Sequence, residues 1–160
     1  MSLPQGRVLI IAGSDSGGGA GIQADIKTVT MLGGYAMTAI TAITVQNTLG
    51  VSAVHEIPPE IVSGQIDAVM SDIGADAIKT GMLANVAIVE HVAAALERHG
   101  AIPAVVDPVM IAKGGAALLD ARALDAVKAL MAPRAALLTP NAPEATQLTG
   151  IDIEDVEDQK

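Results

Sequence analysis

Short apolar runs alternate along this chain with segments in which apolar residues recur every three or four positions. Residues 8–12 and 104–106 are continuous apolar runs, which are typical of buried strands. Residues 22–32 and 85–99 have apolar side chains at helical spacing, and glycine follows each segment. This pattern predicts strand–helix units from one end of the chain to the other.

The same criteria predict further elements. Residues 51–57 alternate between apolar and polar side chains and should form an edge strand or one arm of a hairpin. The other strands are expected at residues 35–45, 77–80 and 135–138, and the other helices at residues 58–71, 121–131 and 142–148. Strand–helix alternation with continuous apolar strands predicts an α/β fold, in which helices cover both faces of a mainly parallel sheet. We expect residues 1–160 to form a single domain.

Composition narrows the possible functions. Half of the chain is hydrophobic (51%), with one Tyr and no Phe, Trp or Cys, so small aliphatic side chains must fill the core and thiolate metal sites are excluded. A net charge of −9 argues against nucleic-acid and membrane partners. The apolar residues 86–96 include Glu90 and His91 and fall short of the roughly 20 residues that span a bilayer. With no targeting segment visible, a cytoplasmic protein is expected.

Small, polar or acidic residues follow five of the predicted strands. In open parallel sheets, ligands bind beyond the carboxyl ends of the strands. Any one of these segments could be an ordinary polar loop, but five of them together favour one shared crevice. The segments are residues 13–21, 46–48, 81–82, 107–110 and 139–144.

Residues 13–21 contain five glycines in nine positions. Residues 19–24 fit a dinucleotide-binding pattern, yet Gly19 comes six positions after Gly13, and the second strand ends in Gln46 instead of an acid. Residues 15–18 are similar to the nucleophile region of trypsin-like proteases. Those proteases are all-β proteins with an upstream histidine, whereas this chain has an α/β pattern with every histidine downstream, so a protease site is rejected. Two interpretations of residues 13–21 are left: a glycine loop that lets the backbone approach a small ligand, or a tight turn without a ligand.

Three polar residues are candidates for binding phosphate or metal. Asp107 comes directly after an apolar strand and could help to hold Mg²⁺, or it could cap a loop. Asn141 and Glu144 share one face at a helix start. Glu144 alone would fit a first-turn acid favoured by the helix dipole. The three histidines lack metal-ligand spacing and are expected to be structural or solvent-facing.

Five segments together carry a family resemblance. They are residues 12–25 (AGSDSGGGAGIQAD), 41–48 (TAITVQNT), 79–83 (KTGML), 106–110 (VDPVM) and 138–145 (LTPNAPEA). In this order they resemble the hydroxymethylpyrimidine/phosphomethylpyrimidine kinases, a family with the ribokinase-like fold. The resemblance covers nearly the whole chain.

The resemblance implies phosphorylation of 4-amino-5-hydroxymethyl-2-methylpyrimidine, and of its monophosphate, in thiamine biosynthesis, with ATP and Mg²⁺ as cofactors. Gln46 would hydrogen-bond the ring nitrogen and the exocyclic amine, because an amide offers a donor beside an acceptor. Asp107, Asn141 and Glu144 would organise the phosphates, with Asp107 and Glu144 holding the metal directly or through water. The remaining residues implied to line the pyrimidine pocket are Gly13, Asp15, Ala20, Met82 and Val109.

The chain departs from the family pattern at its end. The family continues with a G-T-G-C segment that supplies the catalytic residues, and this chain has no Cys. We therefore expect the catalytic residues downstream of Lys160, a chain truncated at its C-terminus, and no turnover by the 160 residues alone. A homodimer is expected, because members of the family that the chain resembles look dimeric. The alternatives are a pyridoxal or pyridoxine kinase of the same superfamily, a non-catalytic pyrimidine-binding module and, third, a dinucleotide-binding domain.

Overall fold

The computed structural model describes residues 5–100, 102–110, 121–153 and 158. Its six strands form one sheet in the order β3-β2-β1-β4-β5-β6. β3 pairs antiparallel with β2, and all other neighbouring strands are parallel. The strands are β1 (Arg7–Asp15), β2 (Tyr35–Asn47), β3 (Gly50–Glu56), β4 (Ala77–Thr80), β5 (Ala104–Val106) and β6 (Leu137–Leu138).

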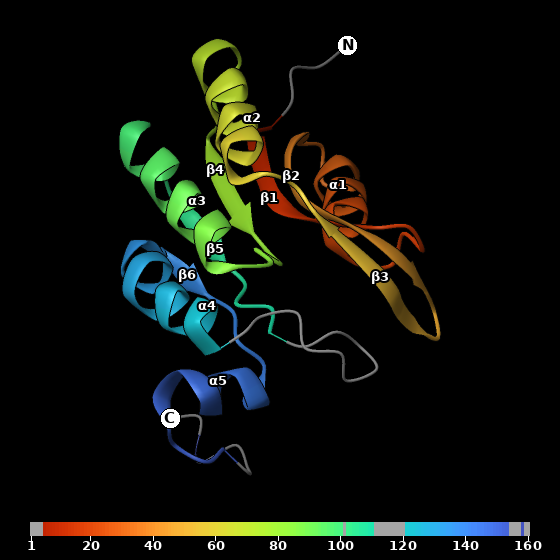
Figure 1. The fold of residues 1–160 in the computed structure, drawn as a ribbon. Helices are drawn as coiled ribbons and strands as arrows, with labels where there is room; N and C mark the ends of the chain where they lie inside the picture. Colours follow the sequence, from red (N-terminus) through yellow and green to blue (C-terminus); the bar gives the residue numbers. More distant parts are fainter. Residues whose placement is uncertain (1–4, 101, 111–120, 154–157, 159–160) are drawn as a thin grey trace.

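Helices cover both faces of this sheet (Figure 1). One face carries α1, and the other carries α2, α3 and the segment from α4 to η1. α5 lies beyond the carboxyl ends of the strands (Figure 1). The helices are α1 (Gly21–Met31), α2 (Pro59–Asp72), α3 (Val86–Arg98), α4 (Ala121–Ala126), η1 (Val127–Met131), η2 (Ala132–Arg134) and α5 (Ala142–Thr149).

β1 is the centre of the core. Leu9, Ile10, Ile11 and Ala12 are completely buried. Successive side chains point to opposite faces of a strand, so Leu9 and Ile11 pack under α2 and α3 whereas Ile10 and Ala12 pack under α1. Burial on both faces explains why the strand reads as a continuous apolar run rather than as an alternating one.

The predicted fold class is confirmed, and the predicted elements are present. Asn85 caps α3 by accepting a hydrogen bond from Ile88 N at 2.9 Å, and Gly100 follows that helix with φ 84°. One difference concerns residues 121–131, where the α-helix changes to a π-helix at Val127. Apolar spacing does not distinguish these two hydrogen-bond patterns, so the sequence could not predict the change.

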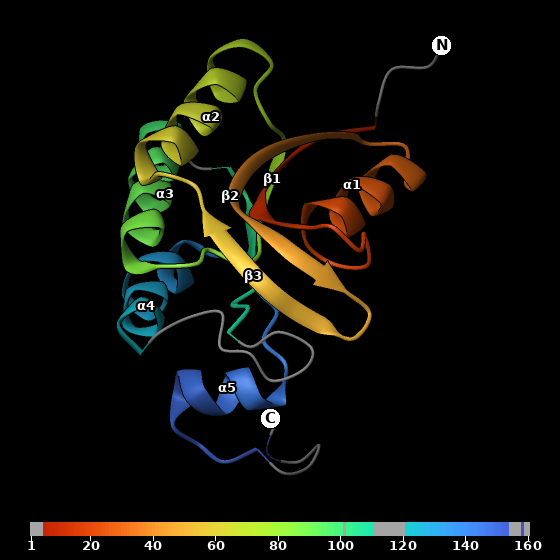
Figure 2. The ribbon, with the colours of Figure 1, turned by 45° about the vertical axis from the view of Figure 1, so that its right-hand side comes forward.

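The β2–β3 hairpin extends away from the helices that cover the sheet (Figures 1 and 2). Several of its large apolar side chains are exposed, among them Val45 and Leu49. No helix in the described part of the chain is long and apolar enough to cross a membrane.

Candidate functional site

A cavity of about 580 Å³ lies at the carboxyl ends of β1, β2, β4 and β5. Its wall is built from the end of β1, the glycine loop (residues 16–20), the first turns of α1 and the residues that follow β4 and β5. This position is where open parallel sheets bind their ligands. The volume falls in the range of about 300–1,000 Å³ that is usual for small-molecule sites.

All six residues predicted to contact the pyrimidine line this cavity, although they come from distant parts of the sequence. Asp107 lines it too, whereas Asn141 and Glu144 lie outside its lining in the described structure. The role of each residue stays a prediction, because lining a cavity does not by itself assign a contact. The six residues are Gly13, Asp15, Ala20, Gln46, Met82 and Val109.

The glycine loop is folded around the carboxylate of Asp15. The two carboxylate oxygens accept hydrogen bonds from the backbone N–H groups of Gly17 (2.7 Å), Gly19 (2.9 Å) and Ala20 (2.8 Å). Successive backbone amides of this kind often bind an anion from solution. Here these amides already donate to the carboxylate of Asp15, a residue that is only 5% exposed. Asp15 therefore shapes the cavity wall rather than leaving the loop open to a phosphate oxygen.

The path of this loop requires glycine at residue 21. Gly21 has φ 55°, and a Cβ placed there would lie 2.3 Å from the carbonyl oxygen of Gly13. An L side chain would therefore meet both backbone strain and a steric clash. The close approach brings the start of α1 against the end of β1, and both segments line the cavity.

Lys79 is a site residue that the sequence analysis did not single out. Its Nζ lies 2.8 Å from an oxygen of Asp25 on α1 and 3.7 Å from an oxygen of Asp107 after β5. Both Lys79 and Asp25 line the cavity, and Lys79 is the one lysine or arginine among its described lining residues. The signal available in the sequence was a charged residue inside a short buried strand, since lysine is almost never buried without a partner.

Burial raises the pKa of the Asp107 carboxyl above its usual range. The positive charge of Lys79 opposes this shift, and the negative charges of Glu144 and Asp25 add to it. Asp107 is therefore a carboxylate whose charge is only partly compensated. A cation beside it would stabilise its ionised form.

Asn141 and Glu144 form a capping box at the start of α5. Asn141 Oδ1 accepts from Glu144 N at 3.0 Å, and Glu144 Oε2 accepts from Asn141 N at 3.0 Å. The other oxygen of Glu144 accepts from Met110 N at 3.3 Å, and the residue is only 5% exposed. Glu144 is thus a first-turn acid of α5, as its structural alternative predicted, and its bond to Met110 N joins α5 to the segment after β5.

The fit of these carboxylates to Mg²⁺ depends on how many of their oxygens remain available. Within the described residues, no group of three or more His, Cys, Asp or Glu side chains is arranged to hold a metal. Mg²⁺ is commonly held by only one or two carboxylates together with substrate phosphates and water. Asp107 suits such a site, and Glu144 suits an indirect position because each of its oxygens already accepts a backbone hydrogen bond.

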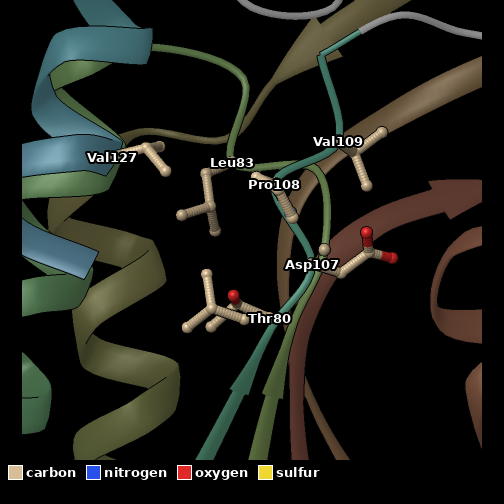
Figure 3. A pocket seen from close by; sticks show the side chains of 8 residues that line it. Thr80, Leu83, Asp107, Pro108, Val109 and Val127 are labelled. Carbon is tan, nitrogen blue, oxygen red and sulfur yellow. The ribbon is translucent and has the colours of Figure 1, made fainter. Parts of the chain in front are cut away.

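A second, much smaller cavity of about 10 Å³ lies behind Asp107, between the strand ends and η1 (Figure 3). The side chains of Leu83, Pro108 and Val127 surround it, and the Asp107 carboxylate points away from them. The buried Thr80 hydroxyl beside this cavity has no hydrogen-bond partner among the described residues. A volume of this size holds at most about one water molecule, so it adds no ligand site.

The fold and the large cavity define an α/β protein with a cavity of small-molecule size at the carboxyl rim of its sheet. The sequence model of the phosphomethylpyrimidine kinase family matches residues 15–160, and the chain belongs to this family.

Two curated relatives illustrate the similarity. The chain is 54% identical over 157 residues to the thiamine biosynthesis bifunctional protein ThiED of Geobacter sulfurreducens, covering 98% of this chain and 32% of that protein. It is 53% identical over 154 residues to the hydroxymethylpyrimidine/phosphomethylpyrimidine kinase of Bacillus subtilis, covering 96% of this chain and 57% of that enzyme. The chain therefore spans between about a third and three fifths of the length of these relatives.

Solved structures agree with this assignment. Phosphomethylpyrimidine kinase from Clostridium difficile matches with a TM-score of 0.90 and 47% identity, over 96% of this chain and 67% of that one. Pyridoxal kinase from Staphylococcus aureus in complex with AMP-PCP and pyridoxal matches with a TM-score of 0.84 and 37% identity, over 99% of this chain and 56% of that one. The ribokinase-like fold expected from the sequence is thus confirmed.

Proposed function

We propose that this chain forms the pyrimidine-binding part of a kinase of thiamine biosynthesis. The substrates would be 4-amino-5-hydroxymethyl-2-methylpyrimidine and its monophosphate. The observation that carries this proposal is the large cavity at the carboxyl rim, where residues from four separate sequence segments meet, Gln46 among them. Membership of the phosphomethylpyrimidine kinase family supports the choice of substrate.

Gln46 would recognise the ring, because its amide can donate to a ring nitrogen while accepting from the adjacent exocyclic amine. Met82, Val109 and Ala20 would supply apolar walls for the two ring faces. Met82 has an unbranched, polarizable side chain that adapts to the shape of a ligand. This suits a cavity whose described lining residues include no aromatic side chain.

ATP and Mg²⁺ are the proposed cofactors, and the metal would neutralise charge on the phosphates. Asp107 would face the phosphate-bound metal, and Glu144 would act through water while it continues to cap α5 with Asn141. The raised pKa of Asp107 supports this role, because its charge lacks full compensation among the described residues. The pyridoxal kinase from Staphylococcus aureus has been solved with AMP-PCP, an ATP analogue.

The groups that activate the substrate hydroxyl are proposed to lie outside these residues, downstream of Lys160. Residues 1–160 alone would then bind the pyrimidine without turning it over. A homodimer is also proposed, and the exposed apolar side chains of the β2–β3 hairpin are compatible with a subunit contact. The cytoplasmic location stays a prediction from the sequence.

Calorimetry with the pyrimidine alcohol tests the ring contact. The variant Gln46→Ala should weaken binding by about 1–3 kcal/mol, because it leaves polar atoms of the buried ring without partners. Gln147→Ala is the matched control, since Gln147 is an exposed amide on α5 outside the cavity lining. Unchanged affinity in a folded Gln46→Ala protein would remove Gln46 from the site.

A pyridoxal kinase is the second candidate, favoured by the structural match to the pyridoxal kinase of Staphylococcus aureus. Turnover of the pyrimidine alcohol and of pyridoxal by the protein expressed from its complete reading frame separates the two. Pyrimidine binding without ATP consumption by that protein would instead indicate a non-catalytic binding module.

A further inference from the structure

The hairpin that carries Gln46 is irregular at this residue. Val45 pairs with Ala53 and Gln46 pairs with Val51, so Ser52 has no opposite residue and the ladder has a bulge. A β-bulge turns the neighbouring side chains away from the regular pleat, and bulges are common beside active sites. The ladder with β3 is therefore irregular beside Gln46, and contacts from other elements can contribute to its backbone conformation.

The Ser16 hydroxyl makes two hydrogen bonds with the backbone of Gln46. It donates to Gln46 O at 2.7 Å and accepts from Gln46 N at 2.8 Å. The parallel ladder between β1 and β2 ends one residue earlier, at the pair Asp15 and Thr44. The Ser16 side chain thus continues the connection between the two strands beyond their last backbone pair.

The side chain of Gln46 has its own support. The buried Thr44 hydroxyl lies 3.2 Å from Gln46 Oε1 and 2.9 Å from the carbonyl oxygen of Ser14, and it can donate its one proton to either of these acceptors. Gly17 lies close to the same backbone, since a Cβ there would be 3.5 Å from Gln46 O. The glycine loop and Gln46 therefore form one connected unit.

We propose that Ser16 is a positioning residue that sets the affinity of the site for an amino-substituted ring by fixing Gln46. This inference rests on the proposed function, in which Gln46 reads the ring. Ser16 itself is exposed and lies outside the described lining of the cavity, so it acts through Gln46 rather than on the ligand. Holding a recognition group in its bound geometry lowers the entropy lost on binding, and loss of that constraint weakens affinity.

The test is calorimetry with the pyrimidine alcohol on the protein expressed from its complete reading frame. Ser16→Ala should raise the Kd about tenfold. Ser16→Thr, which keeps the hydroxyl, should restore most of the affinity. Ser16→Cys keeps the size of the side chain with only a weak hydrogen-bonding group, and it should behave like Ser16→Ala. In turnover assays, KM should rise while kcat stays nearly constant.

The matched control is Ser52→Ala. The Ser52 hydroxyl donates to Val45 O at 3.0 Å, so it bonds to the residue beside Gln46 but from the opposite strand. Its removal should leave the Kd nearly unchanged. If Ser52→Ala and Ser16→Ala weaken binding equally, general loosening of the hairpin explains both and the proposed role of Ser16 is wrong.

A double mutant separates this inference from the function on which it depends. If Ser16 acts only through Gln46, Ser16→Ala should have no further effect in the Gln46→Ala background. A full additional loss there would overturn the inference. Wild-type affinity for Ser16→Ala together with weakened binding by Gln46→Ala would overturn the inference alone. Wild-type affinity for Gln46→Ala would instead refute the proposed ring contact, and the role of Ser16 with it.

Discussion

The two sides of the cavity handle their polar groups in opposite ways. On the side of the glycine loop, the Asp15 carboxylate is saturated by three backbone donors, and Gln46 is held by short hydrogen bonds. On the side of β5, Lys79, at 3.7 Å, is the one positive charge among the described residues that offsets the burial of Asp107 and its acidic neighbours. The first side is organised before any ligand arrives, whereas the second has charge left to compensate.

This difference fits the two kinds of ligand that are proposed. A neutral ring is recognised through a few directed hydrogen bonds, which work best when the groups are already fixed. A phosphate-bound cation is attracted by charge, and an incompletely compensated carboxylate provides that charge. Variants on the side of the glycine loop should therefore affect stability and ring affinity. Variants on the side of β5 should affect the pKa of Asp107.

The largest effect is expected from Gly21→Ala. The new methyl group would meet the Gly13 carbonyl oxygen in a backbone conformation with φ 55°, so the loop must move. We expect the free energy of unfolding to fall by about 2–4 kcal/mol. Urea denaturation measures this change.

Gly64→Ala is the control for that substitution. Gly64 lies within α2, where an added Cβ would meet no atom within 4 Å. Alanine in a helix interior is favoured over glycine by roughly 0.5–1 kcal/mol, so this variant should be slightly more stable. Equal destabilisation by the two variants would contradict the special geometry assigned to Gly21.

A smaller loss is expected from Asp15→Ala, which leaves the amides of Gly17, Gly19 and Ala20 without their acceptor. Hydrogen bonds to a charged group contribute about 1.5–3 kcal/mol, and water can replace part of that contribution at a loop. We expect destabilisation of about 2 kcal/mol and weaker pyrimidine binding. Hydrogen exchange at the three amides measures the effect locally, and unchanged protection would show that Asp15 does not order the loop.

Lys79→Met tests the charged side. Removing the ammonium group leaves Asp107 beside Asp25 and Glu144 without its nearest positive charge, so the pKa of Asp107 should rise further. Titration followed by carbon NMR of the Asp107 carboxyl measures this pKa. Lys27→Met is the control, because Lys27 donates to Gly18 O on the loop and should leave that titration unchanged. A lowered or unchanged pKa in Lys79→Met would contradict the account of this side.

Sequence patterns were sufficient to predict the succession of strands and helices along the chain, but not which side chains pair with one another. Apolar spacing predicted the elements, and the rule about strand ends correctly collected Gly13, Gln46, Met82 and Val109 at one rim. The ion pair between Lys79 and Asp25 depends on how β4 and α1 sit around β1, which no local pattern reports. For the same reason, the double hydrogen bond of Ser16 could not be expected from its position in a glycine loop.

The smallest expected effect lies away from the cavity, at the ion pair between Arg7 and Asp76. The side-chain hydrogen bond from Arg7, together with its backbone N–H, lowers the pKa of Asp76 from 3.8 to about 2. A depressed folded-state pKa stabilises the protein above the unfolded value, and this contribution is lost as the pH falls from about 3.8 to about 2. Asp76→Asn should therefore reduce the difference in Tm between pH 6 and pH 3 only slightly. A larger change than that caused by Gly21→Ala would reverse the expected ranking.

A crystal structure of the protein with 4-amino-5-hydroxymethyl-2-methylpyrimidine tests the central claim most directly. The account predicts the ring inside the cavity, with a ring nitrogen and the exocyclic amine each about 2.7–3.2 Å from the Gln46 amide. It also predicts the Ser16 hydroxyl still bonded to the Gln46 backbone. A ring bound elsewhere, or a Gln46 side chain turned away from it, would contradict the account.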